Sequence, residues 1–178
     1  DNTDPIERIY IQWGFSQFFP AKAMCAHVTG WNKSTSVKFR TDVASMCKLG
    51  FDLGLKELSA DELAYCQTAV TNWKRLQAAI MDGVQYRLVS PYQSNHMAVN
   101  YVSRDTDKAV LFAYDIYPRF QEKLMPVRLQ GLNPNKRDKS DAFRKIRFKS
   151  QWKDIFGRLS HESRFGCIRN GNYAESRY

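Results

Sequence analysis

The fold is decided by "SADELAYCQTAVTNWKRLQAAIMDG", residues 59–83, and by the change of pattern that follows it. Ser59 and Glu62 form a capping box, which marks the start of a helix. Apolar side chains then recur every three or four residues in a single stripe, made of Leu63, Cys66, Val70, Trp73, Leu76, Ala79 and Ile80. This spacing predicts a long amphipathic helix that ends at Gly83.

Strand-like alternation begins at Gln85. Four β-rich runs follow, separated by turn residues: "QYRLVSP", "HMAVNYVS", "KAVLFAYDIY" and "MPVRLQGL". Short runs of this kind are typical of an antiparallel sheet. The sequence therefore predicts α/β structure over residues 1–82 and all-β structure over residues 84–137. The chain has 178 residues, whereas a complete (β/α)8 barrel needs about 250, so an α/β barrel in this chain would be incomplete.

A shorter helix is predicted near the start of the chain. Asp4 is followed by Pro5 and, three residues later, by Glu7, a combination typical of a helix N-terminus. One apolar face follows, made of Ile6, Ile9, Tyr10 and Trp13. Gly14 is expected to end this helix.

The segment between the two helices carries weaker signals. "AMCAHV" predicts a short buried strand, and "FDLGL" a second brief apolar segment. A helix is expected over residues 40–48, closed by Gly50. Arg40 and Asp42 in this helix allow two interpretations, a functional pair or an ion pair at the helix start, and the ion pair is the simpler one.

Asp1 differs from Asp4 because no local structural role explains it. It would lie on a loop just before the first helix, where a preceding strand would arrive. A carboxylate between a strand end and a helix start is a common catalytic position in α/β folds. The alternative is a frayed, solvated terminus, which the local residues alone favour.

The cysteines and histidines form no cluster with metal-ligand spacing; they are Cys25, Cys47, Cys66, Cys167, His27, His96 and His161. Cys25 and His27 are close in sequence, but a nucleophile and its base are defined by their geometry in space. Cys25 lies in the apolar stretch "AKAMCAHV", so burial is expected for it. Burial in a reduced interior is also expected for Cys47 and Cys66.

Four aromatic side chains lie in or just after the first predicted helix: Trp13, Phe15, Phe18 and Phe19. They could form a platform on which a sugar ring stacks. Aromatic residues near a helix end are more often part of the core, and this interpretation is preferred.

The net charge of +9 would ordinarily indicate a nucleic-acid partner, and a small basic binding module is the alternative function. The charge is uneven, however, because residues 136–178 hold 12 Lys and Arg against 5 Asp and Glu. The basic charge therefore belongs to the tail, and no nucleic-acid partner is expected. No apolar run approaches the ~20 residues of a membrane span, and the chain shows no signal-peptide pattern at its start. A soluble protein is expected, and its compartment is left open.

Seven ordered segments resemble the C-terminal part of bacterial α-galactosidases of glycoside hydrolase family 36: "DNTDPIERIYIQWG", "AHVT", "LGFDLGL", "LSADEL", "YRLVSP", "KAVLFAY" and "LQGLNPNKR". The resemblance covers residues 1 to about 137. It implies that residues 1–82 are the last strands and helices of a (β/α)8 TIM barrel. It implies that residues 84–137 are an incomplete antiparallel β-sandwich after the barrel, so that the chain is a truncated piece of the enzyme.

The same resemblance implies a role for Asp1. The family's acid/base motif reads Ser-Asp-Asn-Thr-Asp, and the chain begins at its second residue, which would make Asp1 the proton donor. A retaining glycosidase also needs a carboxylate nucleophile about 5 Å away, and the family's Lys-Trp-Asp nucleophile motif does not occur here. We therefore expect hydrolysis of terminal α-galactosides by the parent enzyme, without a cofactor, and no activity from this fragment alone. Oligomerisation of the parent enzyme is left open.

Residues 138–178 form a basic tail in which the resemblance stops and no clear strand pattern is present. One interpretation is a genuine extension, with "FRKIRFKSQWKDIF" as its best candidate helix. The other is a reading-frame slip. Suitable synonymous codons for residues 150–165, read one base later, allow "HNGKIFSGDYLMKVGL", which resembles the family's last strands, although the single codon of Trp152 limits that freedom. The slip is preferred, and the tail is expected to contribute nothing to the fold.

Overall fold

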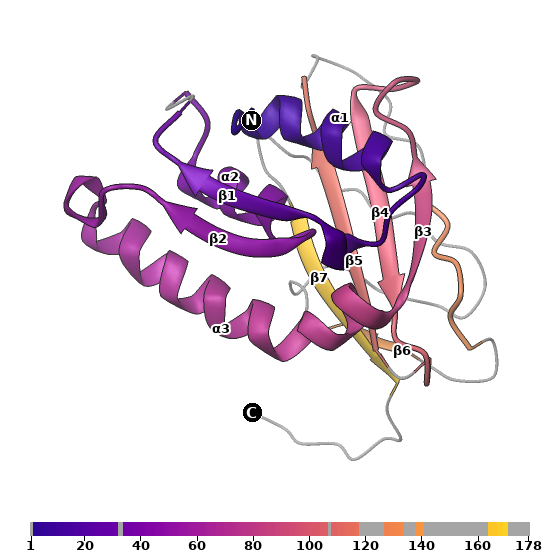
Figure 1. Ribbon diagram of the computed structural model, residues 1–178. Coiled ribbons are helices and arrows are strands. Elements are labelled where there is room, and N and C mark those ends of the chain that lie inside the picture. Colours follow the sequence, from indigo (N-terminus) through magenta and orange to yellow (C-terminus); the bar gives the residue numbers. More distant parts are fainter. Residues whose placement is uncertain are drawn as a thin grey trace.

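The computed structural model describes residues 2–31, 34–106, 108–117, 127–133, 138–140 and 164–170. An α/β layer comes first in the chain and an antiparallel sheet second (Figure 1). The elements of the α/β layer are α1 (Pro5–Phe15), η1 (Ala21–Ala23), β1 (Cys25–Thr29), α2 (Val37–Ala44), β2 (Lys48–Asp52), η2 (Leu55–Glu57) and α3 (Ala60–Asp82). The sheet contains β3 (Val84–Val89), β4 (His96–Val102), β5 (Lys108–Asp115), β6 (Asp138–Ser140) and β7 (Arg164–Asn170).

Helix α1 begins as its local sequence predicts. The Asp4 carboxylate accepts hydrogen bonds from the backbone N–H groups of Ile6 at 2.9 Å and Glu7 at 3.1 Å, and Pro5 is the first helical residue. The helix continues to Phe15 and is capped by Ser16, so Gly14 does not end it. Asp4 therefore has the capping role that was predicted for it.

Helix α2 lies earlier than predicted, because Ser36 caps its start by accepting a hydrogen bond from Phe39 N–H at 3.1 Å. The helix ends at Ala44, and β2 begins at Lys48. The predicted closure by Gly50 is wrong, since this residue lies inside β2 and pairs with His27 of β1. Strands β1 and β2 are parallel.

Helix α3 confirms the capping box: Ser59 Oγ accepts from Glu62 N–H, and the Glu62 carboxylate accepts from Ser59 N–H at 2.9 Å. Four residues of its predicted apolar stripe are buried: Cys66, Leu76, Ala79 and Ile80. Among the described residues, no helix is both long and apolar enough to cross a membrane.

The sheet has the strand order β3-β4-β5-β7-β6, with all pairs antiparallel. The predicted strand "MPVRLQGL" is not found, because its described part, residues 127–132, is irregular. The tail prediction also needs correction. Strand β7 pairs with six residues of β5, and β6 pairs with β7, so residues 138–140 and 164–170 belong to the fold. The backbone groups along this edge of β5 need hydrogen-bond partners, and β7 supplies them.

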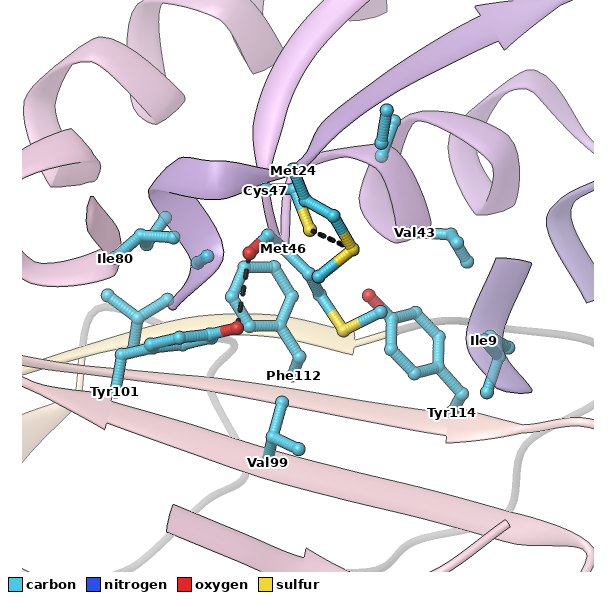
Figure 2. Close-up of a cluster of buried hydrophobic side chains, with 14 of the residues drawn as sticks. Ile9, Met24, Val43, Met46, Cys47, Ile80, Val99, Tyr101, Phe112 and Tyr114 are labelled. Atoms are coloured by element: carbon cyan, nitrogen blue, oxygen red, sulfur yellow. Dashed lines mark hydrogen bonds between the residues drawn. The ribbon is translucent and has the colours of Figure 1, made fainter. Parts of the chain in front are cut away.

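One hydrophobic core joins the α/β layer to the sheet (Figure 2). The α/β layer contributes side chains such as Ile9, Val43, Met46 and Ile80, and the sheet contributes Val99, Tyr101, Phe112 and Tyr114. Phe112 and Val99 are fully buried between the layers. The segments predicted as residues 1–82 and 84–137 are therefore packed on each other through a shared interior.

Candidate active site at the carboxyl ends of β1 and β2

The candidate site lies where the two parallel strands end. Thr29 and Asp52 are the last residues of β1 and β2 and pair with each other in the strand register. Figure 1 shows the N-terminus and the loop after β1 at this same end of the strands. An open hollow of about 1070 Å³ lies here, lined among others by Asn2, Thr3, Thr29, Trp31, Asp52 and Glu57. Catalytic residues of parallel α/β folds gather at this end of the strands.

The first described residues are fixed beside this hollow. Thr29 Oγ1 donates a hydrogen bond to Thr3 Oγ1 at 3.1 Å, and the Asn2 side chain accepts from Asp4 N–H at 2.9 Å. Because Asp4 also caps α1, residues 2–4 are held between the helix start and the end of β1. Asp1 itself, the predicted proton donor, lies outside the described residues.

The predicted burial of Cys25 is wrong, because this thiol is exposed. The reason is tertiary: Ala26 and Val28 of β1 face the core, so alternation along the strand turns Cys25 and His27 to the other face. Both side chains lie on this open face, and the described contacts include no hydrogen bond between them.

Cys47 and Cys66 are buried as predicted. Burial raises the pKa of the Cys47 thiol to about 12, which keeps it protonated and unreactive at neutral pH. Within the described residues, no three His, Cys, Asp or Glu side chains come together in a way that could hold a metal ion.

The predicted ion pair between Arg40 and Asp42 is also wrong. The Arg40 guanidinium donates to the backbone carbonyl of Thr29 at 2.6 Å and so supports the end of β1. The buried Asp42 carboxylate accepts hydrogen bonds from Lys38 Nζ at 2.6 Å and from the Tyr65 hydroxyl at 2.7 Å. Desolvation and the nearby Asp42 carboxylate raise the pKa of Tyr65. These contacts are structural, and the hydrogen bond from Tyr65 to Asp42 joins α3 to α2.

The four aromatic residues in and just after α1 divide into two groups. Trp13 is in the core, as preferred, but Phe18 is 85% exposed and Phe19 is half exposed, with Phe15 stacked on Phe19 at 4.5 Å between ring centroids. A core role is therefore wrong for Phe15, Phe18 and Phe19, which are all exposed. They follow the C-terminal end of α1, about 16 Å of helix away from Asp4, so they are not a sugar platform at the hollow.

Trp31, which no prediction from the sequence included, lines the hollow and is 74% exposed. The available signal was the "TGW" turn directly after a predicted strand. Asp52 was missed for a similar reason, because "FDLGL" indicated an apolar segment without fixing the residue at which the strand ends.

Two family models match two separate parts of the chain. A model of the Melibiase family matches residues 1–83, and a model of the glycosyl hydrolase family 36 C-terminal domain matches residues 96–147. The second match extends beyond residue 137, where the resemblance was expected to stop. The chain is 34% identical over 139 residues to α-galactosidase 1 of Pediococcus pentosaceus, covering 75% of this chain and 19% of the relative. It is also 34% identical over 148 residues to α-galactosidase 2 of Hypocrea jecorina, covering 80% of this chain and 20% of the relative.

Solved structures of family 36 α-galactosidases are also similar to this chain. A variant of the family 36 α-galactosidase AgaA from Geobacillus stearothermophilus in complex with 1-deoxygalactonojirimycin superimposes with a TM-score of 0.86 at 26% identity, over 96% of this chain and 25% of that chain. The AgaB enzyme of the same organism gives 0.87 at 25% identity, with the same coverage. The chain thus spans about a fifth of the length of the curated relatives it matches.

Proposed function

The chain belongs to glycoside hydrolase family 36, and we propose that it forms the last part of a (β/α)8 catalytic barrel and the start of the β-sandwich that follows. The alternation α1, β1, α2, β2, α3 supports this, because a barrel is built from parallel strands with a helix after each. Parallel strands are normally covered on both faces, and the Cys25 and His27 face of β1 is open here. Further barrel strands would cover it.

We assign residues 1–82 to the barrel and residues 84–137 to the incomplete sandwich. Residues 138–178 form the third segment, of which β6 and β7 extend the sheet. The long helix α3 would then be the final helix of the barrel, and Gly83 would mark the passage into the second domain.

The proposed activity of the complete enzyme is retaining hydrolysis of terminal α-linked galactose, without a cofactor. The observation that carries it is the position of residues 2–4, which are fixed at the carboxyl ends of β1 and β2 next to an open hollow. Asp1 precedes these residues and would act as the acid that protonates the glycosidic oxygen, and then as the base that activates water. Related AgaA variants were solved in complex with raffinose and stachyose, and oligosaccharides of this class are the proposed substrates.

The nucleophile would come from the part of the barrel that this sequence does not contain. The purified chain alone is therefore expected to release no nitrophenol from an aryl α-galactoside, because the acid/base is only half of the catalytic pair. Mixing or co-expressing it with the upstream part of the Geobacillus AgaA enzyme is expected to produce activity.

The decisive variant in that mixture is Asp1→Asn, which removes the proposed acid/base. Its matched control is Asp61→Asn, a change at an exposed residue of the first turn of α3. Loss of activity in the first variant alone supports the assignment. Activity of the unmixed chain, or equal activity of both variants in the mixture, would contradict it. The matched relatives give no support to the nucleic-acid-binding alternative.

A further inference from the structure

We propose that Trp31 and Asp52 form a sugar-binding subsite for the part of an α-galactoside that lies beyond its terminal galactose. This inference rests on the proposed function. It concerns substrate specificity. The proposed role of the hollow is to bind sugar, and this binding does not require the catalytic pair.

The position of Trp31 is the first observation. Its side chain is 74% exposed and lines the hollow, although indole rings usually bury most of their surface. The backbone beneath it is well anchored. Trp31 N–H donates to Thr29 Oγ1 at 3.3 Å, and the Thr29 carbonyl accepts from Arg40 at 2.6 Å. The indole therefore extends from a backbone segment that these hydrogen bonds hold at the end of β1.

Asp52 supplies the complementary polar group. It is exposed, lines the same hollow, and ends β2 directly opposite Thr29 in the strand register. A pyranose ring has one face rich in C–H groups and an edge of hydroxyls. The C–H face packs well on an indole, and the hydroxyls donate hydrogen bonds to a carboxylate. Trp31 and Asp52 bring these two chemistries to the same hollow.

The geometry also favours one part of the substrate. The terminal galactose must lie between the two catalytic carboxylates, about 5 Å apart, and thus near the centre of the barrel. Trp31 is two residues past the end of β1, on the loop that leaves the strand. It would therefore contact the leaving group, such as the sucrose part of raffinose.

The test uses the indole N–H signals of the full chain labelled with ¹⁵N-tryptophan. The chain has four tryptophans, and the signal that disappears in Trp31→Phe identifies Trp31. We expect this signal to shift on addition of raffinose or sucrose, with a millimolar dissociation constant, and to shift much less with methyl α-galactoside. Asp52→Asn is expected to weaken the binding several-fold by removing the charged acceptor. Phe18→Ala, another exposed aromatic residue away from the hollow, is the control and should leave the titration unchanged.

Three results would overturn the inference: a Trp31 signal that does not respond to raffinose or sucrose, one that responds fully to methyl α-galactoside alone, or a titration that Asp52→Asn leaves unchanged. Each of these leaves the proposed function standing if the mixing experiment restores activity. Conversely, a sugar response in a chain that never complements AgaA would support the subsite and contradict the barrel assignment.

Discussion

The Tyr101 hydroxyl donates a hydrogen bond to the backbone carbonyl of Met46 at 3.1 Å, and both residues are buried (Figure 2). This bond joins β4 of the sheet to the segment between α2 and β2. A second one links the same layers, since the Tyr114 hydroxyl donates to the Asp42 carbonyl at 2.8 Å. Together with the shared core, these two hydrogen bonds join the α/β layer to the sheet.

The first prediction is that Tyr101→Phe lowers the free energy of unfolding by about 1–3 kcal/mol, because the Met46 carbonyl is left unsatisfied in the interior. Urea unfolding followed by circular dichroism and by tryptophan fluorescence measures it. Both signals should change in one transition, since the layers share one core. Tyr92→Phe, at an exposed tyrosine, is the control and should change stability by less than about 0.5 kcal/mol. Two separate transitions would show that the layers fold independently.

The second prediction compares two glycines. A Cβ added at Gly83 would overlap the Ala79 carbonyl oxygen and lie 2.6 Å from the Val102 carbonyl oxygen. These are backbone atoms that cannot move alone, so Gly83→Ala should cost about 1–3 kcal/mol. A Cβ at Gly50 would instead meet the exposed imidazole of His27, which can rotate away. Gly50→Ala should therefore be the milder change in thermal unfolding, and His27→Ala should remove most of its cost.

The third prediction concerns alkaline pH. The Cys47 thiol has an ordinary pKa of 9.0, and burial raises the pKa to about 12 in the folded chain. Between these values the unfolded chain releases the proton and the folded chain keeps it, so the free energy of unfolding falls as pH rises. The slope contributed by one such group approaches about 1.4 kcal/mol per pH unit. Below pH 9 this stabilisation is fully present.

Cys47→Ala tests this by reducing the slope of stability against pH between 9 and 11, whatever it does to stability at pH 7. Burial also raises the pKa of Tyr101 and Tyr114, so part of the slope should remain. Cys25→Ala, at an exposed thiol, is the control variant to be measured alongside it. An unaltered slope in Cys47→Ala would contradict the assignment.

Local signals decided what the sequence could predict. The Asp4 cap and the Ser59–Glu62 capping box are short-range hydrogen-bond patterns, and both helices begin where these patterns place them. The exposure of Cys25 could not be read in this way, because it depends on which face of a parallel strand pair is covered by other elements. The role of Trp31 at the hollow likewise depends on β1 and β2 ending side by side. The position of Asp1 before the first helix only allowed a catalytic role, and the resemblance of the seven segments to the family gave the proposed role of proton donor.

The sheet edge explains why the tail matters to the fold. Strand β7 pairs with β5 from Lys108 to Ala113. Without β7, these backbone groups would form an open edge next to the central part of the core, and open edges promote association between chains. The family match ends at residue 147, so β7 lies in the part of the chain to which the reading-frame hypothesis applies.

The fourth prediction separates the two interpretations of residues 138–178 with three versions of the chain. Removing residues 138–178 should lower solubility and the melting temperature, because β5 loses β7, its partner on the side away from β4. Replacing residues 150–165 by "HNGKIFSGDYLMKVGL" should raise the melting temperature above that of the natural chain if a reading-frame slip produced the tail. The physical reason is that "DYLMKVGL" supplies apolar side chains that a strand can bury against the core. Sequencing the coding DNA around codon 150 provides an independent check. If the replacement lowers stability while the truncation also does so, the tail is a genuine part of this fold and the slip hypothesis is wrong.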